Sequence, residues 1–251
     1  MNQFSGNRLY RIGIVGLGAI ANNVHIPVLS TFRDVNVEAA ADIDENRVEK
    51  IAKRWNIKKT YRNYEEMYEK SSLDAVFICV PPILHYPAAR SALEQGLHVF
   101  CEKPMGISST DAIELVRISQ KRNLVLAVGY NLRTVKNYVR AARIVENMLL
   151  GRILQINAIM TRAGPYVGWI PSGEWHFNEA EGGVLHDLGS HLLDLVAYIL
   201  LDKIATVSAK SAQTMHLKIF DNIAGVFETK NGTLGTCLLY TSDAADEEDS
   251  V

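Results

Sequence analysis

The feature that most constrains the fold is residues 11–21, which read Arg-Ile-Gly-Ile-Val-Gly-Leu-Gly-Ala-Ile-Ala. A short apolar strand, a glycine turn and the start of a helix follow one another, as in dinucleotide-binding units. Gly16 allows the tight turn, Gly18 lets the backbone approach a pyrophosphate, and Ala21 takes the third place of the pattern, where helix meets strand. The phosphates would lie at the free N–H groups of the helix N-terminus, whereas the alternative is a tight turn without a ligand. We expect cofactor contacts from Gly16, Leu17, Gly18, Ala19 and Ile20.

The second apolar run, residues 35–41, ends at Asp42. A carboxylate at this place accepts hydrogen bonds from the adenosine ribose hydroxyls and repels a 2′-phosphate. The alternative role is an N-cap for the helix predicted at 45–55, but Asp44 suits that position better. We therefore expect NAD as the cofactor, with NADP less favoured.

Strands and helices alternate through the first half of the chain, which indicates a doubly wound parallel sheet, the Rossmann α/β architecture. After the glycine turn we expect strand 35–41, helix 45–55, strand 74–80, helix 86–95, strand 97–101, helix 109–122 and strand 124–128. The first domain is then residues 1–128.

The pattern changes from residue 129, where strands follow one another without intervening helices. We expect helix 135–150, strand 152–161, a loop over 162–183, helix 185–201 and strands 204–212, 222–229 and 233–240. Asn231-Gly232 predicts the hairpin turn between the last two strands. Consecutive strands favour an α+β domain with a mostly antiparallel open sheet over residues 129–236.

Composition and charge argue against several classes of function. The chain has 251 residues, 48% apolar composition and a net charge of −2, and its Lys and Arg residues form no stripe with interleaved aromatics, which argues against a nucleic-acid partner. Three widely spaced cysteines fit neither a disulfide framework nor a zinc site. The N-terminal residues lack the apolar core of a signal peptide, and no run has the length of a membrane span. We expect a cytoplasmic protein that acts on a small molecule and needs no metal.

Two further motifs carry a resemblance. Glu102-Lys103-Pro104 ends a strand of the first domain, and residues 182–191 read Gly-Gly-Val-Leu-His-Asp-Leu-Gly-Ser-His. Together with the glycine turn, and in this order, they make residues 8–236 resemble the glucose-fructose oxidoreductase and inositol dehydrogenase family (Gfo/Idh/MocA). The resemblance implies hydride transfer between a nicotinamide cofactor and a carbon of a sugar, sugar nucleotide or cyclitol. It also implies that Lys103, Asp187 and His191 carry the catalysis and contact the substrate.

The residues themselves agree with this chemistry. Asp187 and His191 are four apart on a predicted helix, so they share one face, and Gly189 is expected to leave room for a ligand. His186 is five residues before His191, about 140° around an α-helix, and should face elsewhere. Oxidation of a carbinol needs a base for the hydroxyl proton and a cation that favours the alkoxide, and His191 and Lys103 are the candidates. Taken singly, each could instead be an ordinary surface or core residue.

Other candidates rest on the same resemblance. The loop after the strand that ends at Val80, the Glu102 motif and the segment Gly-Tyr-Asn-Leu-Arg at 129–133 are expected to border the cofactor and the substrate. This adds Val80, Pro81, His85, Glu102, Lys103 and Asn131 to the cofactor contacts, and Arg133, Trp169 and Trp175 to the substrate contacts. Polar contacts at helix starts or between domains are the alternative for His85, Asn131 and Arg133. The loop tryptophans, with His176, could equally fill a domain seam.

The C-terminal residues 237–251 resemble the in-frame translation of a transposon-type sequencing adapter. We expect an open reading frame that is cut short by sequence assembly, so that the second domain is truncated and the native protein continues after about Thr236; a genuine acidic tail is the alternative. Relatives suggest a homo-oligomer, a dimer or tetramer. Two other functions stay open, an NAD-dependent glycosidase that oxidises its sugar transiently and a non-catalytic NAD or sugar sensor.

Overall fold

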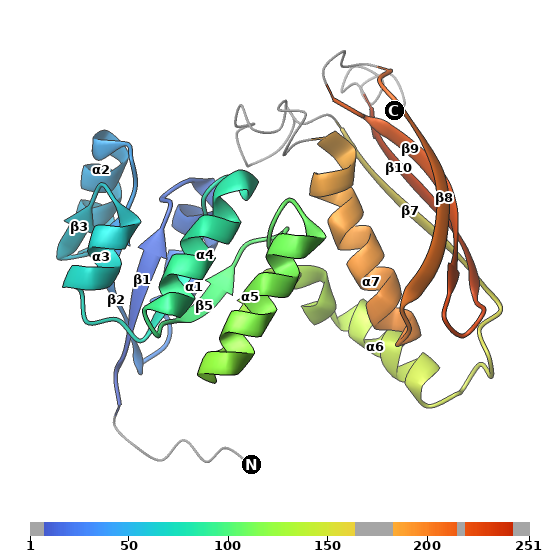
Figure 1. Ribbon diagram of the computed structural model, residues 1–251, viewed down its shortest axis with the longest axis horizontal. Coiled ribbons are helices and arrows are strands. Elements are labelled where there is room, and N and C mark those ends of the chain that lie inside the picture. Colours follow the sequence, from blue (N-terminus) through green and yellow to red (C-terminus); the bar gives the residue numbers. More distant parts are fainter. Residues whose placement is uncertain (1–7, 164–182, 215–218, 243–251) are drawn as a thin grey trace. The chain divides into compact units, whose positions relative to one another are not determined.

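The computed structural model describes residues 8–163, 183–214 and 219–242 and divides into two compact units, residues 1–129 and 130–251 (Figure 1). The first unit is built on a six-stranded parallel sheet in the order β3-β2-β1-β4-β5-β6. Its strands are β1 Tyr10–Val15, β2 Val35–Ala41, β3 Lys59–Tyr61, β4 Ala75–Ile78, β5 His98–Cys101 and β6 Leu126–Val128. The order reverses between β1 and β4, where open α/β sheets bind ligands at the carboxyl ends of their strands.

Helices cover both faces of this sheet, as expected for a doubly wound fold. They are α1 Ile26–Leu29, α2 Glu45–Trp55, α3 Tyr64–Lys70, α4 His85–Glu94 and α5 Ser109–Arg122. One buried cluster joins the sheet to α3, α4 and α5 through Met67, Ala92 and Leu115, and a second joins it to α1 and α2 through Ile26 and Ile51. Because both faces are covered, the central strand β4 is apolar throughout.

Side chains that begin and end these helices explain their bounds. Asp44, Asn63 and Ser108 each accept a backbone N–H in the first turn of α2, α3 and α5. Asn56 and Asn123 adopt the left-handed conformation that ends α2 and α5. The expected bounds of these two helices are confirmed, whereas β3 and α3 were not foreseen.

The second unit contains a four-stranded sheet in the order β7-β10-β9-β8, in which β7 and β10 are parallel and the other pairs are antiparallel. Its strands are β7 Gln155–Ala163, β8 Ile204–Ala212, β9 Asn222–Thr229 and β10 Leu234–Ser242, and its helices include α6 Lys136–Glu146 and α7 Ser190–Leu200. Helix α7 lies along one face of the sheet (Figure 1), where Leu192 and Val196 pack with Phe227 and Leu239. The mostly antiparallel sheet is as expected.

Two details of this unit bear on the sequence-based expectations. Gly232 has φ +81° in the connection from β9 to β10, which confirms the turn at Asn231-Gly232. Strand β10 continues through residues 237–242 of the segment expected to be foreign, with Cys237 and Leu239 buried.

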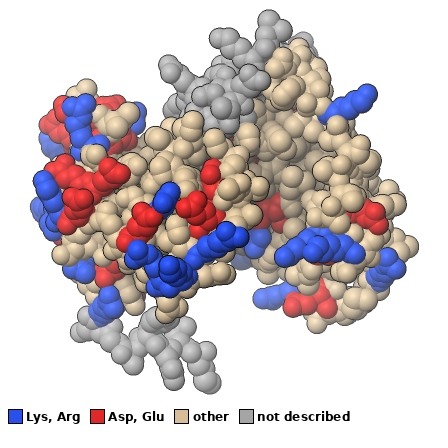
Figure 2. Space-filling model, in the orientation of Figure 1, with Lys and Arg blue, Asp and Glu red and all other residues tan. Residues whose placement is uncertain are grey.

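Charge is spread rather than concentrated. On the face shown in Figure 2, acidic and basic side chains interleave over the first unit.

In the described ranges, no helix is long and apolar enough to cross a membrane. The same ranges contain no group of three or more His, Cys, Asp or Glu residues arranged to hold a metal ion.

Candidate functional site

The glycine turn follows β1, and its two glycines have different roles. Gly16 has φ +84°, and a Cβ there would lie 2.6 Å from the carbonyl oxygen of Cys79, so only glycine fits against the end of β4. A Cβ on Gly18 would meet nothing within 4 Å. Ala21 is fully buried where the following π-helix η1, Ala21–His25, packs against the sheet. The turn is therefore closed on the protein side and open at Gly18, the arrangement needed for close approach of a phosphate.

Asp42 lies beside this turn at the end of β2 and is only 7% exposed. Its Oδ2 accepts the Leu17 N–H at 2.7 Å, and its Oδ1 accepts the Asp44 N–H at 2.9 Å. Asp44, rather than Asp42, caps α2 by accepting the Arg47 N–H at 3.1 Å. Asp42 is thus fixed next to the glycine turn, and the alternative role as helix cap belongs to Asp44.

Arg47 is a neighbour of Asp42 that the sequence analysis missed. Its Nη1 lies 3.2 Å from Oδ1 and 3.1 Å from Oδ2 of Asp42, and its side chain is 45% exposed. With the two backbone donors, Arg47 fills the four acceptor positions of the carboxylate. Ribose hydroxyls can therefore bind Asp42 only if Arg47 moves away. Its place in the first turn of α2, close to the end of β2, was the available signal.

Lys103 follows β5 at the carboxyl edge of the same sheet. The N–H of Glu102 donates to the Ile78 carbonyl at 3.0 Å, and the N–H of Gly129 donates to the Cys101 carbonyl at 2.9 Å. These bonds hold the end of β5 between β4 and β6. Lys103 itself is half-buried.

The Glu102 carboxylate contacts a histidine of the same unit. Its Oε1 lies 2.7 Å from Nε2 of His25, at the end of η1. This contact lowers the pKa of Glu102, although burial acts in the opposite direction as the larger single influence. The role of Glu102 as a cofactor contact stays a prediction, and His25 is a residue that sequence reasoning did not assign.

His85 is 1% exposed, at the start of α4. Its Nδ1 lies 2.6 Å from the Pro104 carbonyl oxygen and its Nε2 lies 2.8 Å from the Val80 carbonyl oxygen. Burial lowers the pKa of His85, while the two carbonyl contacts oppose that shift. Val80 also lies against the glycine turn, because its Cγ1 would be 2.9 Å from a Cβ on Gly16. Pro81 is exposed beside it.

In the second unit, Asp187 lies in a π-helix, η5 Leu185–Gly189, that runs into α7. The Ser190 N–H bonds the Leu185 carbonyl five residues earlier, and the Ser190 hydroxyl bonds the His186 carbonyl at 2.8 Å. Asp187 and His191 are both half-buried. Their spacing stays close to one face of the helix, although the expected regular α-helix over 185–201 is wrong at its start.

Gly189 does not have the role expected of it. A Cβ there would lie 2.9 Å from Cδ1 of Leu239 and 3.0 Å from Cδ1 of Leu185. The absence of a side chain therefore allows η5 to pack closely against β10. Room for a ligand is not the reason for this glycine.

Arg133 and His191 each contact a neighbour within the second unit. The Arg133 guanidinium forms a two-pronged ion pair with Asp194 of α7, at 2.8 and 2.6 Å, and lies 5.5 Å from the centre of the Tyr198 ring. The Tyr130 ring meets the His191 ring edge to face at 6.1 Å. A substrate contact by Arg133 stays a prediction, as does a cofactor contact by the exposed Asn131. Trp169, Trp175 and His176 lie outside the described residues.

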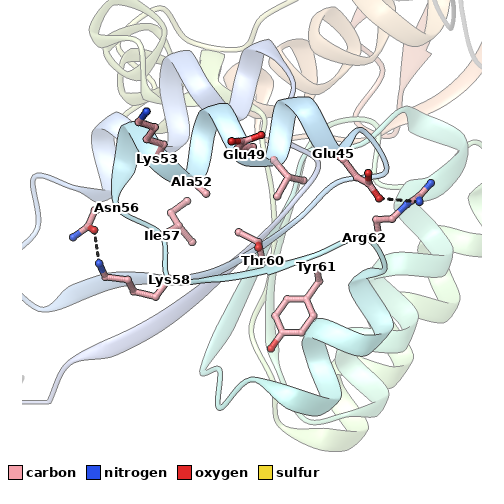
Figure 3. A pocket seen from close by; sticks show the side chains of 11 residues that line it. Glu45, Glu49, Ala52, Lys53, Asn56, Ile57, Lys58, Thr60, Tyr61 and Arg62 are labelled. Carbon is pink, nitrogen blue, oxygen red and sulfur yellow. Dashed lines mark hydrogen bonds and ion pairs between the residues drawn. The ribbon is translucent and has the colours of Figure 1, made fainter.

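A surface pocket of about 650 Å³ lies between α2 and β3. Figure 3 shows the Glu45–Arg62 ion pair, 2.9 Å, at one end and the Lys58–Asn56 hydrogen bond, 2.6 Å, at the other. None of the candidate residues from the sequence lines it. We therefore place the candidate site at the carboxyl edge of the sheet and not in this pocket.

Comparison with known proteins identifies related sequences and structures for both units. Residues 10–130 match the model of the oxidoreductase family with an NAD-binding Rossmann fold, and residues 138–251 match the GFO/IDH/MocA C-terminal domain. Myo-inositol 2-dehydrogenase of Thermotoga maritima is 27% identical over 90% of this chain and 66% of its own length. D-glucoside 3-dehydrogenase of Escherichia coli is 30% identical over 93% of this chain and 70% of its own length.

A crystal structure of scyllo-inositol dehydrogenase from Lactobacillus casei with NAD(H) and scyllo-inositol has the same fold. Its TM-score is 0.82 at 21% identity, covering 94% of this chain and 71% of that one. The chain thus spans 66 to 71% of the length of these three relatives. With both family models matched in order, the chain belongs to the GFO/IDH/MocA family of oxidoreductases.

Proposed function

We propose that this protein is an NAD-dependent oxidoreductase that transfers a hydride between nicotinamide and a carbinol carbon of a sugar, sugar nucleotide or cyclitol. The proposal rests on the residues that lie together at the carboxyl edge of the parallel sheet. The open turn at Gly18, Asp42 and Lys103 follow the carboxyl ends of β1, β2 and β5, around the reversal of strand order. Relatives whose names give an inositol or a glucoside as substrate support the substrate class.

The roles of the residues follow from the chemistry. The free N–H groups after the glycine turn would hold the pyrophosphate, and Asp42 would bind the ribose hydroxyls and disfavour NADP. Nicotinamide, when bound, supplies the hydride acceptor or donor. His191 would take the hydroxyl proton, Asp187 would act with it, and the Lys103 ammonium would favour the alkoxide.

A screen for NAD⁺ reduction tests this proposal. The purified chain is incubated with NAD⁺ and a panel of aldoses, inositols and nucleotide sugars, and NADH absorbance is followed, with Lys103→Met as the matched variant. Net NADH formation that depends on Lys103 is the expected result. Cleavage of a glycoside that requires NAD⁺ without net NADH would instead identify a glycosidase. Binding of NAD⁺ and sugar without turnover of either kind would identify a sensor and refute the proposal.

We also propose self-association through the sheet of the second unit. The face opposite α7 exposes Ile159, Val226 and Leu238 at 59, 56 and 39%. Adjacent apolar side chains on an open sheet favour a contact with another copy. Sedimentation of the wild type should show a dimer or larger species, and Val226→Lys should shift it toward the monomer. A wild-type monomer at all concentrations would contradict this.

A further inference from the structure

Lys103 lies between two residues that each contact a histidine, one half-buried and one buried. On one side, Nε2 of His25 lies 2.7 Å from Oε1 of Glu102. On the other side, Nδ1 of His85 lies 2.6 Å from the carbonyl oxygen of Pro104. The two histidines come from η1 and α4, two elements that flank the carboxyl edge of the sheet.

The His25 ring is fixed by aromatic packing. Its centre lies 5.5 Å from that of Phe77 on β4 and 5.2 Å from that of Phe100 on β5, and these two phenylalanines stack on each other at 4.6 Å. With 13% of its side chain exposed, the imidazole has little freedom to turn away from Glu102. Because His25 ends the helix that the glycine turn begins, this contact joins the phosphate-binding element to the end of β5.

The Glu102 carboxylate is held on its other side as well. Its Oε2 accepts the N–H of Lys103 at 3.3 Å, so the carboxylate contacts the lysine backbone directly. The carboxylate lies close against the Gly129 backbone, because a Cβ at that position would be only 3.0 Å from the same oxygen. The His25 contact is therefore passed to the lysine through a side chain that cannot shift far.

His85 restrains the residue after the lysine. Besides the Pro104 carbonyl, its Nε2 lies 2.8 Å from the Val80 carbonyl at the end of β4. At 1% exposure the ring has no solvent to replace either contact. A neutral imidazole carries a single N–H, which we assign to Nδ1 because its carbonyl contact is the shorter, so His85 holds the Pro104 carbonyl after Lys103.

We propose that His25 and His85 are positioning residues, which fix the backbone on the two sides of Lys103 and so aim its ammonium at the reacting oxygen. This inference rests on the proposed function, in which Lys103 takes part in hydride transfer. Displacement of a catalytic group by about 1 Å can cost about a hundredfold in rate. Loss of either contact should therefore lower kcat while cofactor binding at the glycine turn is retained.

A crossed substitution tests the inference, because an asparagine amide lies near the Nδ1 position of a histidine and a glutamine amide near the Nε2 position. His25 acts through Nε2, so His25→Gln keeps a donor for Glu102 and His25→Asn loses it. His85 acts on Pro104 through Nδ1, so His85→Asn keeps the donor and His85→Gln loses it. We expect kcat to fall about tenfold or more for His25→Asn and His85→Gln, and to stay within about threefold for their counterparts.

His98 is the matched control. It lies at the opposite end of β5, is exposed, and makes one hydrogen bond to the backbone, from the Val125 N–H to its Nδ1 at 2.9 Å. Both His98→Asn and His98→Gln should keep the wild-type kcat. Melting temperature and affinity for ADP-ribose, which lacks nicotinamide, are measured on every variant to show that fold and glycine turn are intact. If the His85 variants do not fold, the His25 pair decides the test.

The Lys103→Met background separates positioning from general damage. If the histidines act through Lys103, His25→Asn should cost nothing further once the ammonium is gone. The inference would be overturned if His25→Asn lowered kcat by the same factor with and without Lys103→Met. It would also be overturned if the same substitution, Asn or Gln, were the more damaging one at both histidines. Either result would leave the proposed function standing. Normal turnover in Lys103→Met itself would overturn the role of Lys103 and the inference with it.

Discussion

Asp42→Ser tests the preference for NAD over NADP most directly, because Arg47, which could bind a 2′-phosphate, already lies beside Asp42. In the wild type, Arg47 contacts both oxygens of Asp42 at 3.1 and 3.2 Å. Serine removes the carboxylate but keeps an oxygen that can accept the Leu17 N–H, so the turn should survive. The freed guanidinium then lies beside the expected ribose position.

The expected change in NAD⁺ binding free energy follows from two opposing contributions. A hydrogen bond from a ribose hydroxyl to a carboxylate contributes about 1.5–3 kcal/mol. Displacing Arg47 costs up to about 1 kcal/mol, because its side chain is 45% exposed. Asp42→Ser should therefore weaken NAD⁺ binding by about 1–2 kcal/mol, roughly five- to thirtyfold. NADP⁺ binding should strengthen, which moves the ratio of the two dissociation constants by about tenfold or more.

The assay is calorimetric titration of NAD⁺ and NADP⁺ into each protein, which needs no substrate. Asp44→Ser is the matched control, since Asp44 also contacts Arg47, at 3.4 Å, and serine keeps the helix cap. Its cofactor ratio should stay near the wild-type value. An unchanged ratio in Asp42→Ser, or an equal shift in Asp44→Ser, would refute the assignment of Asp42 to the ribose.

Three further results are expected. Lys103→Met should lower turnover about a hundredfold or more in steady-state assays, with NAD⁺ affinity little changed, because one preorganised donor to the developing oxyanion is lost. Asp74→Asn should lower the free energy of unfolding by about 1 kcal/mol in urea titrations and leave NAD⁺ affinity unchanged, because Asp74 accepts the Arg11 N–H at 2.8 Å at the opposite, amino edge of the sheet. The contacts with Arg11 hold the pKa of Asp74 well below its usual range, so its contribution should be present above about pH 4 and be lost on further acidification. Burial lowers the pKa of His85, so the unfolded chain binds its proton more readily and stability should fall as pH drops below about 6.5, less steeply in His85→Asn.

Local sequence signals predicted the regular elements well. Helices α2 and α5 begin and end at the expected residues, because Asp44 and Ser108 cap their starts and Asn56 and Asn123 can adopt the left-handed conformation at their ends. Strands β8 and β9 also match, with turn residues at their boundaries. These features depend on residues a few positions apart, which a sequence displays directly.

The contacts that shape the candidate site join residues that are far apart in the sequence. His25 and Glu102 are 77 positions apart, and His85 and Pro104 are 19 apart, so no periodicity connects them. The motif around Lys103 was visible in the sequence, but what restrains its backbone was not. Arg133 shows the same limit, because its ion pair with Asp194 spans 61 positions and uses the guanidinium that was expected to meet substrate.

The start of the helix that carries His191 could not be predicted for a physical reason. A π turn adds one residue to an α-helix, so residues before it rotate relative to those after it by about the 100° that one residue spans. The 140° expected between His186 and His191 is thereby reduced, which brings His186 toward the face that Asp187 and His191 share, and all three are half-buried. Gly189 makes this turn possible, since it lets the widened backbone pack within reach of Leu239. An apolar pattern with a period of 3.6 cannot reveal such an insertion, because Leu188 and Leu192 still meet the sheet on the same side.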